Sequence, residues 1–185
     1  MMHKYEPEIK DYLMREIELL PFNQCKVDIL TKPDYNNPPM GCFSLDKDGN
    51  PVAQFYTEVI KDSIGTHSAE IIRKGGVQKF IQRIVRHECR HYMQYEYMKD
   101  SGIDYNNILD IENKFQYGDG PLEKDAKDFA NGIVNDLAEM VKEFYTESKR
   151  VEEPVKEESN TTIETPKVEE QPVATNTKKK KRRKK

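Results

Sequence analysis

Several residue types and sequence patterns are scarce or missing in this chain. Its 185 residues include no tryptophan, four histidines and three cysteines. Cys25, Cys42 and Cys89 are odd in number and widely spaced, and no two of them form a CxxC motif. This pattern argues against a disulfide framework and against a cysteine-rich zinc site. We expect reduced thiols that lie in the core.

Patterns that identify some common protein classes are also missing. The sequence has no glycine-rich phosphate-binding loop, no GxSxG nucleophile motif and no internal repeat. No apolar run is long enough to span a bilayer, and the first residues, MMHKYEPEIKDYL, lack the apolar segment of a signal peptide. We therefore expect a soluble, cytoplasmic protein without a membrane span.

Charge is abundant but unevenly distributed. Charged residues make up 34% of the chain, and the net charge is −3. Lys178 begins a run of eight cations that ends at Lys185, so residues 1–177 carry a net charge of −11. Residues 149–185 are rich in Glu, Lys, Pro and Thr and lack apolar periodicity, which is typical of a disordered tail. We predict one domain over residues 1–148 and a disordered tail with a basic end over residues 149–185.

Hydrophobic periodicity predicts a domain of mixed helices and strands. The predicted helices cover residues 5–20, 76–98, 108–115 and 121–146. The predicted strands cover residues 26–30, 42–45 and 52–59, and the Asp-Gly turn in residues 46–50 joins the last two into a hairpin. The predicted fold class is α+β, with a small antiparallel sheet or hairpin packed on helix 76–98 and on helix 121–146.

An HExxH pattern lies within the predicted helix 76–98, at His87, Glu88 and His91. A helical wheel places these three residues on or next to the apolar side of the helix, whereas Arg86 and Arg90 lie on the other side. A buried carboxylate without a partner is costly, and a zinc site with a bound water would use Glu88. The alternative is a core helix whose histidines only hydrogen-bond to neighbouring groups.

An open zinc site needs a third protein ligand. No histidine follows His91, and the upstream His3 and His67 are the weaker candidates. Glu123, in the first turn of the predicted helix 121–146, lies at the edge of an apolar stripe that includes small alanines, which allow helices to approach closely. We predict that Glu123 is the third ligand. The alternative is an acidic residue that stabilises the helix N-terminus through the helix dipole.

The segment ExxAxxFA that starts at Glu123 resembles the segment after HExxH in the ImmA/IrrE group of gluzincin metallopeptidases, which are small bacterial and mobile-element proteins. An uncharacterised phage or bacterial zincin-like protein fits equally well. The resemblance covers residues 76–137. It implies a zincin-like fold, a zinc cofactor held by His87, His91 and Glu123, Glu88 as the general base, and a protein or peptide substrate.

A zinc peptidase also needs a surface for the peptide and groups that support the ligands. We expect strand 52–59 to be an edge strand along which an extended peptide pairs. Gln94 either reaches the cleft or faces solvent. Asp125 is either a partner of a ligand histidine or a solvated acid. The candidate donors to the oxyanion, which the sequence cannot rank, are Tyr95, Tyr105 and Tyr117.

The basic end of the tail supports a different reading, that of a binding protein or of a zincin fold that has lost turnover. Cations from Lys178 to Lys185 on a flexible tether suit a salt-sensitive contact with nucleic acid or an acidic partner. No aromatic residue is interleaved with them, so any nucleic-acid contact is expected to be non-specific. A purely solubilising tail is the alternative.

Overall fold

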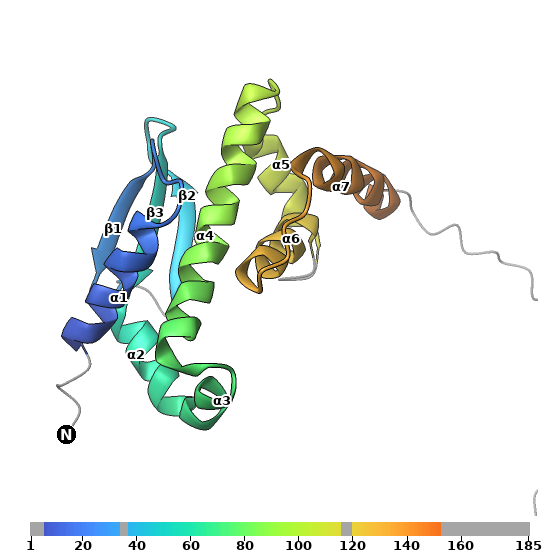
Figure 1. Cartoon of the computed structure of the whole chain (residues 1–185). Helices are drawn as coiled ribbons and strands as arrows, with labels where there is room; N and C mark the ends of the chain where they lie inside the picture. The colour runs from blue at the N-terminus through green and yellow to red at the C-terminus, as the bar shows by residue number, and fades with distance from the viewer. Residues whose placement is uncertain (1–5, 34–36, 116–119, 153–185) are drawn as a thin grey trace, which may run out of the picture. The chain divides into compact units, whose positions relative to one another are not determined.

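The computed structural model describes residues 6–33, 37–115 and 120–152 (Figure 1). The described residues belong to one compact unit, and residues 154–185 lie outside the described ranges. The predictions for Tyr117 and for the tail from residue 153 onward also fall outside them and stay predictions.

The described residues form an α+β fold with one small sheet. The strands are β1 (Lys26–Leu30), β2 (Gly41–Leu45) and β3 (Pro51–Tyr56). The helices are α1 (Glu6–Glu18), α2 (Thr57–Thr66), α3 (Ser68–Arg73), α4 (Gly76–Asp100), α5 (Tyr105–Glu112), α6 (Pro121–Ala130) and α7 (Leu137–Glu152). Periodicity does not predict α2 and α3. No helix within the described ranges combines the length and the apolar character needed to cross a membrane.

The sheet is mixed, with the strand order β1-β3-β2. The predicted hairpin of β2 and β3 is confirmed, and Asp46 organises its turn by accepting hydrogen bonds from the backbone N–H groups of Asp48 and Asn50, both at 2.9 Å. The expectation of an all-antiparallel sheet is wrong, because β1 pairs with β3 in parallel. The prediction that residues 52–59 form an edge strand is also wrong. The observed strand β3 lies in the centre of the sheet and ends at Tyr56, and the edge strands among those described are β1 and β2.

Helix α4 is the central element of the fold. It lies between the sheet with α1 on one side and α6 on the other (Figure 1). One side of α4 contributes apolar residues such as Val85 and Cys89 to the core. In the middle of the helix, polar residues such as Arg90 and Gln94 are buried as well. The HExxH residues of α4 are therefore surrounded by the sheet and α1 on one side and by α6 on the other.

The predicted helix 121–146 is in fact two helices, α6 and α7. The turn after α6 depends on Gly132, whose left-handed conformation, at φ +95°, lets its N–H donate to the carbonyl of Phe129 at 3.0 Å. Helix α7 then starts after Asp136, whose side chain accepts a hydrogen bond from the N–H of Ala138 at 2.7 Å. The Asn-Gly pair and the capping aspartate are the local signals for this break.

Candidate metal centre

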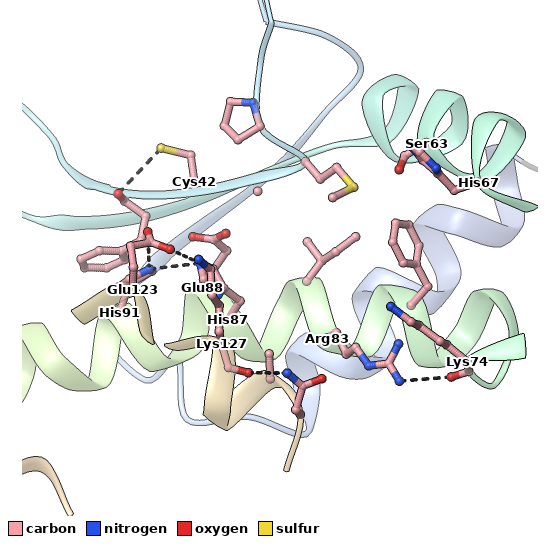
Figure 2. A pocket seen from close by; sticks show the side chains of 18 of the residues that line it. Cys42, Ser63, His67, Lys74, Arg83, His87, Glu88, His91, Glu123 and Lys127 are labelled. Atoms are coloured by element: carbon pink, nitrogen blue, oxygen red, sulfur yellow. Dashed lines mark hydrogen bonds and ion pairs between the residues drawn. The ribbon is translucent and has the colours of Figure 1, made fainter. Parts of the chain in front are cut away.

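The two histidines of the HExxH pattern and Glu123 converge on one point between α4 and α6. His87 and His91 lie one turn apart on α4, and Glu123 lies in the first turn of α6. The two histidine Nε2 atoms are 3.2 Å apart. Glu123 presents Oε2 at 3.5 Å from Nε2 of His87 and Oε1 at 3.4 Å from Nε2 of His91 (Figure 2). The sequence-predicted ligands are thus brought together.

These three residues could hold a metal ion, since one donor atom from each lies within 4.8 Å of the others. In a tetrahedral zinc site the donors lie about 2.0–2.1 Å from the metal and therefore about 3.3 Å from one another. The two histidine nitrogens are 3.2 Å apart, which is close to this value, and each oxygen of Glu123 approaches one histidine, Oε2 at 3.5 Å from His87 and Oε1 at 3.4 Å from His91. Two imidazoles and one carboxylate that lie this close together are a donor set that suits a metal ion, and three protein ligands would leave a fourth position to another ligand.

The local charges suit a cation. Burial, followed by the charge of His91, lowers the pKa of His87 to about 4, which keeps this imidazole neutral and able to bind a metal near pH 7. Burial alone would lower the pKa of His91, but its hydrogen bond with Glu123 and the charges of Glu88 and Glu123 outweigh burial and raise it. The hydrogen bond with His91 is the main cause of the lowered pKa of Glu123, which favours the carboxylate.

Glu88 lies beside this cluster, next to β2. The residue is 6% exposed, and burial is the main cause that raises the pKa of its carboxyl group to about 7. The backbone N–H of Phe43 on β2 donates a hydrogen bond to the carboxylate. Strand β2 can approach so closely because residue 41 is glycine: a Cβ atom there would lie 2.8 Å from Cγ of Glu88. A carboxyl group held here can both accept and return a proton near neutral pH.

The position of Glu123 depends on Glu112, a residue to which no sequence pattern pointed. The Glu112 carboxylate, at the end of α5, accepts hydrogen bonds from the backbone N–H groups of Leu122 at 3.4 Å and Glu123 at 3.2 Å. It thus caps the N-terminus of α6 in place of a local side chain. The close approach requires Gly120, because a Cβ atom at this position would overlap the Glu112 carboxylate.

The cluster opens into a cavity of about 820 Å³. Helix α4 forms one wall of this cavity and β2 forms another. Figure 2 shows the three candidate ligands at one end of the cavity, and His67, Lys74 and Arg83 at the other end. The cavity is therefore large enough to place a substrate against the cluster.

The two alternative histidine ligands are not part of the cluster. His67 is exposed and does not belong to the three-donor group, although it lines the same cavity. His3 lies outside the described residues. Among the described candidates, Glu123 alone joins the two histidines of the HExxH pattern.

The two described tyrosines that were candidate oxyanion donors can now be ranked. The hydroxyl of Tyr95 donates to the carbonyl of Gly49 in the hairpin turn at 3.3 Å, so it is directed away from the cluster. Tyr105 lines the cavity. Burial, followed by the charges of Glu112, Glu88 and Glu123, raises the pKa of Tyr105, so its hydroxyl stays protonated. Tyr105 is the better candidate of the two.

One inference from the helical wheel is wrong, because Arg90 does not face away from the interior. Its side chain is 1% exposed and forms a two-contact ion pair with Asp125 of α6, at 2.7 and 3.0 Å. Asp125, at 3% exposed, is therefore not a solvated acid. The helical wheel mispredicted Arg90 because α6 packs against the polar side of α4 and carries Asp125, which neutralises the arginine. Gln94, likewise, is fully buried instead of facing solvent.

No known protein family, curated protein or solved structure matches this chain. The metal-binding interpretation therefore depends on the geometry of the cluster, and the resemblance to gluzincins depends on the motif residues alone.

Proposed function

We propose that this protein is a zinc-dependent metallopeptidase with a zincin-like fold. The observation that carries the proposal is the convergence of His87, His91 and Glu123, of which one donor atom each lies within 4.8 Å of the others, with the Glu88 carboxyl group beside them. Two imidazoles and one carboxylate are a ligand set found in catalytic zinc sites, which keep one position open.

Each residue then has a defined task. Zinc bound by these ligands would activate a water molecule and polarise a peptide carbonyl. Glu88 accepts a proton from the attacking water and returns it to the leaving amine nitrogen, so that one water is consumed for each peptide bond that breaks. Tyr105, which lines the cavity, would donate a hydrogen bond from its hydroxyl to the substrate oxygen.

The cavity suits an extended peptide. Its volume of about 820 Å³ is within the usual range for a ligand site, and one wall is the edge strand β2. A peptide that pairs with an edge strand gains backbone hydrogen bonds that do not depend on its sequence. We therefore assign to β2 the peptide-pairing role that was first predicted for strand 52–59. Gly41 and Phe43 of this strand contact Glu88, next to which the scissile bond would have to lie.

Metal content tests the first half of the proposal. The purified chain should contain close to one zinc per molecule, and the His87→Ala, His91→Ala double variant should contain none. His67→Ala is the matched control, because it removes a cavity histidine that does not belong to the cluster. A wild-type protein that binds no zinc after incubation with the metal would refute the proposal.

Cleavage of an unfolded protein substrate tests the second half. Glu88→Gln preserves the shape of the side chain and should keep the metal, but it cannot accept a proton. We expect the cleavage rate to fall at least about 100-fold, the lower end of what acid–base catalysis contributes. Equal cleavage by the wild type and Glu88→Gln would rule out Glu88 as the base.

A further inference from the structure

Gln94 connects the candidate metal centre to a buried polar network. It lies on α4 one turn after His91 and is fully buried. Its Oε1 atom is 2.9 Å from Nδ1 of His91, on the opposite side of the ring from the cluster. Its Nε2 atom donates to the backbone carbonyl of Leu122 at 3.0 Å and to Oδ2 of Asp125 at 2.7 Å.

This network allows only one orientation of the Gln94 amide. The carbonyl of Leu122 can only accept hydrogen bonds. Asp125 also acts as an acceptor, because Arg90 and the side chain of Asn135 donate to it. Rotating the amide by half a turn would place its oxygen against these acceptors, so the amide nitrogen must face α6 and the amide oxygen must face the histidine.

The orientation of the amide determines which ring nitrogen of His91 carries a proton. An amide oxygen only accepts, so Nδ1 must be the protonated nitrogen that donates to it. The other nitrogen, Nε2, faces His87 and Glu123 and is therefore the one that would offer its lone pair to a bound metal. A ligand histidine is commonly held in this way by a hydrogen bond to its second nitrogen.

We propose that Gln94 is a positioning residue of the metal centre, which holds His91 with its proton on Nδ1 and its Nε2 directed at the metal. Asp125 and Arg90 act through Gln94 by fixing the direction of its amide. The proposal rests on the proposed function, because it assumes that His91 binds a metal. Helix α6 thus serves the centre twice, with Glu123 as a ligand and with Asp125 as a support.

His87 provides a comparison within the same site. It donates a hydrogen bond to the backbone carbonyl of Ala126, a group that no substitution removes. The support of His91 instead depends on a single side chain. Removing that side chain should therefore weaken metal binding through His91 while the support of His87 remains in place.

The test uses the full chain and the variants Gln94→Leu and Gln94→Met, which keep the approximate size of the side chain but replace the amide oxygen with a group that accepts no hydrogen bond (leucine) or only a weak one (methionine). Asn135→Ala is the matched control, since Asn135 donates to Oδ1 of Asp125 whereas Gln94 donates to Oδ2. Zinc affinity is measured by competition with a chelator. The protonated nitrogen of His91 is identified in the metal-free protein by ¹H–¹⁵N NMR of the histidine side chains.

We expect the zinc dissociation constant to rise about 10- to 100-fold in the Gln94 variants and to stay unchanged in Asn135→Ala. The Nδ1 proton of His91 should be observed in the wild type and in Asn135→Ala and should disappear in the Gln94 variants. A folded Gln94 variant with wild-type zinc affinity would overturn the proposal, as would a wild-type His91 protonated at Nε2 alone.

The two measurements separate this proposal from the proposed function. The NMR spectrum of the metal-free wild type identifies the protonated ring nitrogen of His91, and this result is obtained even if both Gln94 variants fail to fold. A wild type that shows the Nδ1 proton but binds no zinc would refute the metallopeptidase and, with it, the positioning role.

Discussion

Arg90 of α4 and Asp125 of α6 form a buried ion pair in which Nε and Nη2 of the arginine contact the two carboxylate oxygens at 2.7 and 3.0 Å. Nη2 also donates to the backbone carbonyl of Asn135 at 2.6 Å, and the guanidinium lies 5.2 Å from the centre of the Phe129 ring. The pair therefore joins the histidine helix to the helix that carries Glu123. Its integrity should affect both the stability of the fold and the spacing of the donors.

The first prediction concerns this pair. Arg90→Ala leaves the Asp125 carboxylate buried without its cation, so the free energy of unfolding should fall by about 3–5 kcal/mol. Arg83→Ala is the matched control, because Arg83 lies on the same helix and donates a hydrogen bond to the Lys74 carbonyl at 3.1 Å. Its effect should stay below about 1 kcal/mol. Urea unfolding measures both variants, and equal losses would show that the ion pair has no special role.

The second prediction concerns the contact between β2 and Glu88. Gly41→Ala places a Cβ atom 2.8 Å from Cγ and 2.9 Å from Oε1 of Glu88, so β2 or Glu88 must move. We expect a loss of about 1–3 kcal/mol in the free energy of unfolding, together with slower peptide cleavage at unchanged zinc content.

Gly65→Ala is the control for this substitution, since a Cβ added there meets no atom within 4 Å beyond its chain neighbours and the adjacent backbone of its own helix. It should leave the stability and the cleavage rate of the protein unchanged or slightly improved, because alanine is favoured over glycine within a helix. If Gly41→Ala behaves like Gly65→Ala in thermal unfolding, the close contact between β2 and Glu88 is absent in solution.

The third prediction concerns the pH dependence of thiol reactivity. Burial raises the pKa of Cys25 from 9.0 to about 11, and the negative charge of Glu96 contributes a smaller increase. A raised pKa keeps a thiol in its neutral, unreactive form to higher pH. The rate of Cys25 alkylation should therefore keep rising up to about pH 11, beyond the ordinary value of 9.0. Mass spectrometry of the labelled peptide measures the rate, with the urea-unfolded chain as the control. A folded chain whose rate levels off at the same pH as the unfolded chain would contradict the prediction.

The fourth prediction concerns the basic run from Lys178 to Lys185. If these cations contact nucleic acid, binding should weaken with salt, with a slope of log affinity against log salt no steeper than about −7 for eight neutralised phosphates. Deleting residues 178–185 should abolish this binding and leave zinc content and cleavage unchanged. A filter-binding titration measures the affinity. Retained affinity in the deleted chain would assign the contact to another surface, and no affinity in the full chain would favour a solubilising tail.

The candidate ligand set and the hairpin could be predicted from the sequence because both are signalled by local patterns. The spacing of His87 and His91 places them on one helix face whatever the rest of the chain does. The hairpin forms because Asp46 and Gly49 favour the turn between two short apolar segments. Glu123 was found because it lies at the edge of the apolar stripe of its own helix.

What the sequence determined by itself is therefore short-range: the helix face that carries the HExxH residues, the turn of the hairpin and the acid most suited to be a third ligand. The tertiary structure alone decided which strand lies at the edge of the sheet, that Arg90 is buried, and that Gln94 contacts His91 and Glu112 accepts hydrogen bonds from the first turn of the helix that carries Glu123. These features depend on which elements pack against each other, because the burial and partner of a side chain come from residues distant in the sequence. A helical wheel can identify the faces of α4, but only the packing of α6 against it shows that its polar face is also part of the interior.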